Sequence, residues 1–181
     1  MMSKSKCKQL VFALAAVATA LVVAPRGAHA IGFGAGVGLV QNQSGPLGDS
    51  RGFFGRLGLI GPLDLQVDYA RTDYDAERSD SRFGVGLRLE PFHLGHWVPA
   101  IFANTGINSV DAGRWSGKLG FTELGLGIVY AFTDNIRAEL DVREGHDSLL
   151  TGDESTQPMS VMSAAHGESY TAGGLALSVD F

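Results

Sequence analysis

Two residues of a long polar stretch, His146 and Ser148, are of the types used in nucleophilic catalysis. A histidine near a serine can act as the base that activates the hydroxyl as a nucleophile. Glu154 or Glu168 would then be the acid that orients the imidazole. The alternative interpretation is that both are polar loop residues just beyond a strand.

Four carboxylates fall within eight residues and form the second group that suggests chemistry: Asp73, Asp75, Glu77 and Asp80. Hard oxygen ligands of this kind suit Ca²⁺. The calcium-binding loop of an EF-hand needs glycine at its sixth position, where this chain has Arg78. The residues therefore predict a solvated acidic loop and no specific metal site.

Other features that resemble binding motifs predict no cofactor. His93 and His96 are three residues apart in an expected turn, and no third metal ligand is evident. The glycines of residues 32–38 loosely resemble a nucleotide-binding loop, but they alternate with apolar residues and no helix follows. We therefore expect no catalytic residues, no cofactor and no metal.

The first 30 residues have the layout of a cleaved secretory signal peptide. Three lysines precede an apolar run of residues 10–24, and Ala28 and Ala30 give the small residues of a cleavage site. The alternative, an uncleaved membrane anchor, is disfavoured because the run is shorter than the roughly 20 residues that a spanning helix needs. The mature protein is expected to be a single domain of residues 31–181.

Composition narrows the function of that mature chain. Cleavage removes four basic residues and no acidic one, leaving ten basic and nineteen acidic residues and a net charge of −9. Such a charge argues against nucleic-acid binding, which is expected to use a basic face. Cleavage also removes Cys7, the only cysteine, so disulfides and thiol chemistry are excluded.

The mature chain alternates apolar with polar or small residues, the period of β-strands. Seven strands are clear, at residues 31–39, 53–59, 65–70, 82–90, 123–132, 136–143 and 174–181. An eighth must lie within residues 97–106, but the alternation there does not say which face is apolar. Short connections (61–62, 91–96 and 133–135) alternate with longer polar ones (41–50, 72–80, 107–118 and 144–169). The pattern predicts an all-β fold of eight antiparallel strands whose chain ends meet on the short-turn side.

The polar face of these strands decides between two architectures. It combines charges with many glycines, as at Gly84, Gly86 and Arg88. Glycines weaken strands, but a narrow eight-stranded lumen needs small residues beside a few long ones. We therefore predict that the polar face lines the lumen, where five arginines and six carboxylates form a structural network of ion pairs: Arg56, Asp68, Arg82, Arg88, Glu90, Glu123, Arg137, Glu139, Asp141, Arg143 and Asp180. The alternative is a soluble β-sandwich with a solvated polar face.

The alternating segment 125–143, with its hairpin at residues 133–135, and the terminal Phe181 resemble small Gram-negative outer-membrane barrels. The resemblance is to the family of the outer membrane protein A transmembrane domain and outer membrane protein X. It implies an eight-stranded up-and-down transmembrane β-barrel in the outer membrane. It also implies that the barrel-assembly machinery reads Phe181 as its assembly signal.

We expect a structural or surface-contact role, in envelope integrity or adhesion, with outer-membrane lipid and lipopolysaccharide as partners. A surface ligand is not identified by the residues. A narrow channel for small solutes is the first alternative. A lipid A-modifying enzyme is the second, because outer-membrane lipid A 3-O-deacylases are also small barrels with a His/Ser pair and a later Glu. Leu149 follows Ser148 where those enzymes place Asn, which counts against this alternative.

Overall fold

The computed structural model describes residues 31–42, 47–74, 78–152 and 169–181. They form eight strands, which are β1 (Ile31–Asn42), β2 (Leu47–Ile60), β3 (Leu63–Asp73), β4 (Arg78–Leu89), β5 (Trp97–Ala112), β6 (Trp115–Ala131), β7 (Ile136–Thr151) and β8 (Ser169–Asp180). Among the described residues, no helix is long and apolar enough to cross a membrane. The predicted leader lies outside the described residues.

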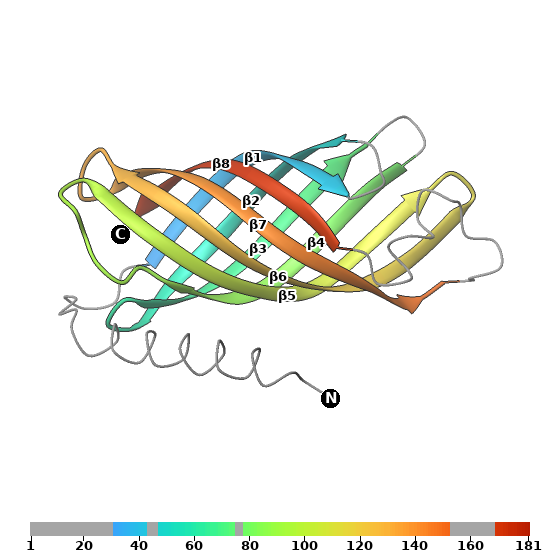
Figure 1. Cartoon of the computed structure of the whole chain (residues 1–181), viewed down its shortest axis with the longest axis horizontal. Coiled ribbons are helices and arrows are strands. Elements are labelled where there is room, and N and C mark those ends of the chain that lie inside the picture. The colour runs from blue at the N-terminus through green and yellow to red at the C-terminus, as the bar shows by residue number, and fades with distance from the viewer. Residues whose placement is uncertain (1–30, 43–46, 75–77, 153–168) are drawn as a thin grey trace, which may run out of the picture.

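Each strand pairs antiparallel with its neighbour in sequence, and β1 pairs with β8 to close the barrel (Figure 1). The start of β1 meets the residue after β8, because Ile31 and Phe181 exchange two backbone hydrogen bonds of 3.2 and 2.8 Å. Closure leaves no free sheet edge. The predicted eight-stranded antiparallel up-and-down barrel is confirmed.

The short turns lie at the end where Ile31 pairs with Phe181. Gly61 adopts a φ of 56° between β2 and β3, a left-handed conformation that glycine adopts without strain. In the turn between β6 and β7, the Thr133 hydroxyl accepts hydrogen bonds from the backbone amides of Asn135 and Ile136. The predicted hairpin at residues 133–135 is therefore stabilised locally by the side chain of Thr133.

The strands run much further into the polar segments than their apolar alternation predicts. β5 and β6 continue until only Gly113 and Arg114 separate them, so the expected loop at residues 107–118 is a hairpin. This hairpin extends furthest at the end opposite the C terminus (Figure 1). Beyond the apolar positions the strands satisfy their backbone groups by pairing, which requires no apolar face.

The outward face carries an apolar belt around the barrel. Its most exposed members are 51–64% exposed: Phe33, Val37, Phe53, Phe83, Leu124, Leu126, Leu140, Val142, Leu175 and Leu177. On β7 the belt ends at Val142, and the next outward residues are Glu144 and His146. On β2 it ends at Phe53, which is followed outward by Arg51.

The structure settles which face of β5 points inward. Val98, Ala100 and Phe102 are buried in the interior, whereas Trp97 and Ile101 are exposed on the outer face. At the short-turn end Trp97 packs against Tyr130 at 4.7 Å, and Tyr130 against Phe132 at 5.0 Å between ring centroids. This aromatic cluster forms part of a girdle at the rim of the apolar belt.

Candidate functional site

The lumen near the short-turn end is filled by a chain of alternating charges. Glu139 on β7 binds two arginines, Arg56 on β2 and Arg88 on β4, each at 2.6 Å. Arg88 also lies 3.0 Å from Glu90, whose second oxygen is 3.1 Å from Arg137. Arg137 completes the chain with Asp180, at 2.7 Å. These six residues, from four strands and the residue after β4, tie opposite walls of the barrel together.

A second group crosses the middle of the lumen. Arg82 on β4 lies 2.9 Å from Glu123 on β6, and the hydroxyl of Tyr170 on β8 donates to the same carboxylate at 2.9 Å. Arg143 lies 2.8 Å from Asp141 and 3.7 Å from the other oxygen of Glu123. Arg82 also donates to the Tyr170 hydroxyl. Every predicted lumen arginine therefore has a carboxylate partner in the described structure.

Asp68 differs from the other predicted lumen carboxylates. The amide of Asn104 donates to it at 3.2 Å, Gln66 is a second side-chain partner, and no ion pair joins Asp68 to an arginine in the described structure. Asn104 sits on β5, where the sequence left the inward face undecided. The expectation of arginine partners for every lumen carboxylate is therefore too simple, because neutral donors also satisfy these groups.

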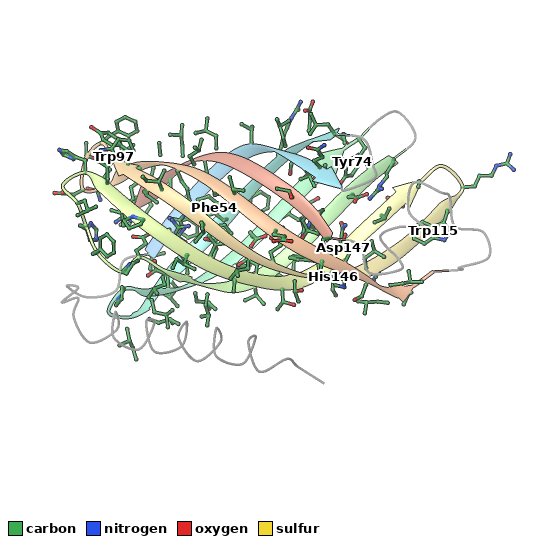
Figure 2. All side chains as sticks on the ribbon, viewed as in Figure 1. Phe54, Tyr74, Trp97, Trp115, His146 and Asp147 are labelled. Atoms are coloured by element: carbon green, nitrogen blue, oxygen red, sulfur yellow. The ribbon has the colours of Figure 1, made fainter. Side chains whose placement is uncertain are left out.

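Aromatic rings fill the space between the two charged groups. The guanidinium of Arg56 lies 4.3 Å from the ring centroid of Phe54, and that of Arg143 lies 5.1 Å from Phe102. Phe54 is visible within the barrel in Figure 2. Gly125 lies against the Phe102 ring so closely that a Cβ there would fall 2.2 Å from it. A cavity of about 100 Å³ lies among these side chains.

A third polar group, which the sequence analysis missed, lies beyond the apolar belt. Arg78 binds Asp80 at 2.9 Å, and its guanidinium stacks over Tyr74 at 4.3 Å. Asn108 donates to Asp80 at 3.2 Å. The alternation of Arg78, Asp80 and Arg82 with outward serines is the signal that would have found this group. In the sequence alone, the carboxylates of this segment favour a solvated acidic loop instead.

Asp147 faces this third group from β7 and is buried (Figure 2). Its Oδ1 has no hydrogen-bond partner among the described residues. Burial raises the pKa of Asp147 to about 6, with the nearby Asp80 and Glu123 adding to the rise and Arg82 opposing it. Burial likewise raises the pKa of Tyr74. This end of the lumen therefore holds a carboxyl that is sensitive to mild acid.

His146 and Ser148, the pair weighed for nucleophilic catalysis, both lie on the outer face of the barrel. Both lie within β7 and point outward, so they are strand residues and not loop residues beyond the strand. The Ser148 hydroxyl donates to the backbone oxygen of Gly120 at 3.4 Å, and no hydrogen bond joins it to His146 in the described structure. The candidate acids Glu154 and Glu168 lie outside the described residues.

The predicted acidic loop is divided by the sheet. Asp73 is exposed on the outer face beside Arg71, whereas Asp80 is buried in the lumen. Asp75 and Glu77 lie outside the described residues. The interpretation of this whole segment as a solvated loop is therefore wrong for Asp80. No group of three potential metal-ligating residues occurs in the part of the chain that the structure describes.

His93 and His96 are both exposed in the connection between β4 and β5. His96 bonds through Nδ1 to the backbone oxygen of Ala131 at 2.9 Å, which ties this connection to the end of β6. The predicted assembly signal, Phe181, follows β8 and is 74% exposed on the outside of the barrel. Its aromatic ring is accessible to another molecule.

Comparisons with known proteins support the fold. Neisserial surface protein A shares 15% identity and a TM-score of 0.59, covering 84% of this chain and 95% of its own. The N-terminal β-barrel domain of Pseudomonas aeruginosa OprF shares 15% identity and a TM-score of 0.60, covering 86% and 100%. Both are eight-stranded outer-membrane barrels. No family model matches the sequence. No curated protein matches it either. The finer resemblance to outer membrane proteins A and X stays a prediction.

Proposed function

We propose that this chain is an integral outer-membrane barrel that supports the envelope and makes surface contacts, and that its lumen is closed to solutes. The observation that carries the proposal is the combination of an apolar belt outside and paired charges inside. An exposed apolar surface that encircles a whole barrel is costly in water and favourable in lipid. Charged side chains in the lumen are stabilised when they pair with one another.

The closed lumen follows from how its side chains cross it. Glu139 joins Arg56 to Arg88 and therefore bridges β7, β2 and β4. An eight-stranded barrel leaves an interior that side chains just fill. A cavity of about 100 Å³ is lined by charged residues and by Phe54 and Phe102. This packing supports a structural role over the channel alternative.

The surface-contact part of the proposal rests on the long strands. β5, β6 and β7 continue past the apolar belt, and their outward residues there include Lys118, Glu144 and His146. Long connections of such barrels face the exterior. The β5–β6 hairpin therefore projects polar side chains from the membrane to where another surface can reach them.

Conductance across a planar bilayer tests the closed lumen. The purified wild-type chain should insert, as judged by protection of the belt from protease, and should give no stable conductance steps. A double variant that removes aromatic bulk from the lumen, Phe54→Ala with Phe102→Ala, is the matched control. Regular and reproducible single-channel steps from the wild-type protein would refute the closed lumen and favour a narrow channel for small solutes.

A strain lacking the chain tests the envelope role. It should become more sensitive to detergent, and the wild-type gene should restore resistance. A variant shortened in the β5–β6 hairpin should restore detergent resistance but not attachment of cells to surfaces. Equal attachment with and without the hairpin would count against the surface-contact role.

A further inference from the structure

Two arginines of neighbouring strands face each other on the outside of the barrel. Arg51 on β2 is the direct partner of Arg71 on β3, and both are exposed. Like charges directly opposite in a sheet destabilise the pair. Arg71 lies 3.2 Å from Asp73, but Arg51 makes no ion pair with any residue that the structure describes. The pair therefore leaves positive charge available to an external anion.

The depth of these arginines is fixed by the residues below them. The adjacent pair on the outer face, one step closer to the short-turn end, is Phe53 with Tyr69, whose rings pack at 5.2 Å between centroids. Aromatic residues of this kind sit at the boundary between hydrocarbon and headgroups. Arg51 and Arg71 stand one step further toward the long-loop end. In a membrane-embedded barrel this is the level of lipid headgroups.

An apolar groove begins beside Arg51. Gly173 on β8 is flanked directly by Leu39 on β1 and by Val142 on β7, and it contributes no side chain between them. A Cβ at Gly173 would meet only a backbone oxygen at 3.8 Å, so the space in front of it is open. The groove is about 590 Å³, and Val37, Leu140, Leu175, Asp49 and Arg51 also line it.

From this arrangement we infer that the groove and the arginine pair together bind a phosphate-bearing lipid of the external leaflet. One acyl chain lies over Gly173 between Leu39 and Val142, and the headgroup phosphate lies against Arg51 and Arg71. Guanidinium groups bind phosphate through short charge-assisted hydrogen bonds. Asp49 and Asp73 form the next pair on the outer face, one step closer to the long-loop end. They repel a phosphate placed closer to that end and so set its depth. The inference rests on the proposed membrane location and names the lipid that this location brings to the site.

Native mass spectrometry of the full mature chain, released from octyl glucoside micelles, tests this inference. The probes are lipid A with two phosphates and the same lipid with both phosphates removed, at equal concentration. The wild-type chain should retain the phosphorylated form about tenfold more, as expected for two arginines near an anionic group. Arg51→Gln combined with Arg71→Gln should abolish this preference.

Two further variants separate the groove from the charge. Gly173→Leu places an apolar side chain in the open space in front of Gly173, where a Cβ meets nothing closer than 3.8 Å, and should lower retention of both lipid forms several-fold. Arg114→Gln, at the exposed tip of the β5–β6 hairpin, removes one positive charge elsewhere and should change nothing. Gel mobility before and after heating should report a folded barrel for every variant.

Three results would overturn the inference: equal retention of the two lipid forms by the wild-type chain, unchanged retention by Gly173→Leu, or complete displacement of the lipid by excess inorganic phosphate. The last would reveal a simple anion site with no role for the groove. Failure of the closed-lumen proposal would look different, because it would give conductance steps and leave lipid retention unchanged.

Discussion

The inner and outer faces of β7 obey opposite rules, although their residues alternate along one strand. Glu139 points inward and is held by two arginines, whereas Leu140 points outward and is 59% exposed. Beyond Val142 the rule changes again, because the outer face becomes polar while Asp147 remains buried inside. Within the apolar belt, charged side chains are therefore accepted on the inner face and apolar ones on the outer face. Beyond the belt, the outer face also accepts polar side chains.

The largest expected effect comes from breaking the inner face. Glu139→Ala leaves Arg56 and Arg88 without their shared carboxylate, and removing one partner of a buried pair typically costs roughly 3–5 kcal/mol. Glu144→Ala, on the outer face of the same strand beyond the belt, should cost less than about 1 kcal/mol. Urea titration of unfolding in lipid vesicles measures both. Similar losses for the two variants would contradict the role of the lumen network.

The second effect, somewhat smaller, is the loss of stability when a charge is placed on the outer face of the belt. Leu140→Arg places a guanidinium against lipid and should cost about 2–4 kcal/mol near the midplane. Ser178→Arg points into the lumen, opposite Arg137 on β7 and two residues from Asp180. Repulsion from the first and attraction to the second partly offset, so its electrostatic cost should be lower than that of Leu140→Arg, although crowding opposes it. The same titration in vesicles compares the two variants. A much larger penalty for Ser178→Arg would mean that the faces are reversed.

A smaller effect depends on pH and concerns the end of the lumen beyond the belt. Because the pKa of Asp147 is about 6 in the folded barrel and about 4 in an unfolded chain, the folded state binds this proton more tightly. Its contribution to the free energy of unfolding is therefore greatest below pH 4 and declines as pH rises to 6. Asp147→Asn should stabilise the barrel at pH 7.5, by on the order of 2 kcal/mol, and much less at pH 4.5.

Unfolding titrations of the wild type and of Asp147→Asn at the two pH values provide the measurement. Only the difference between the two proteins is used, because other carboxyl groups titrate in both. Ser148→Ala, on the exposed outer face of the same strand, removes no titratable group, so it serves as the control and should show no such pH dependence. An equal effect of Asp147→Asn at both pH values would exclude the raised pKa.

The smallest expected effect on stability is at Phe181, where a large effect on assembly is expected instead. The side chain is 74% exposed, so Phe181→Ser should change the free energy of unfolding of the refolded barrel by about 1 kcal/mol or less. If the assembly machinery reads this residue, the amount of barrel in the outer membrane should fall while secretion continues. Quantifying the protein in membrane and periplasmic fractions checks this. If the Phe181→Ser variant accumulated normally in the outer membrane, Phe181 would not be an assembly signal.

Much of the fold could be predicted because strand periodicity is local. The alternation of residues 31–39 and 136–143 identifies strands and faces directly, and the glycines opposite the charges indicate a narrow lumen. The ends of the strands could not be predicted. Residues 107–118 carry few apolar side chains, and they are strand because β5 and β6 hydrogen-bond to each other across Gly113 and Arg114.

The sequence by itself determined which side chains share a face, since residues two apart in an extended chain point the same way. It therefore determined the set of charges that enter the lumen together. Only the tertiary structure decided which of them pair, because Arg56 meets Glu139 across 83 residues through the closure of the barrel. The tertiary structure also decided that Asn104 donates a hydrogen bond to Asp68 and that Asp147 is buried. It decided as well that Arg51 lies opposite Arg71. Pairing across strands depends on register, which no single strand encodes.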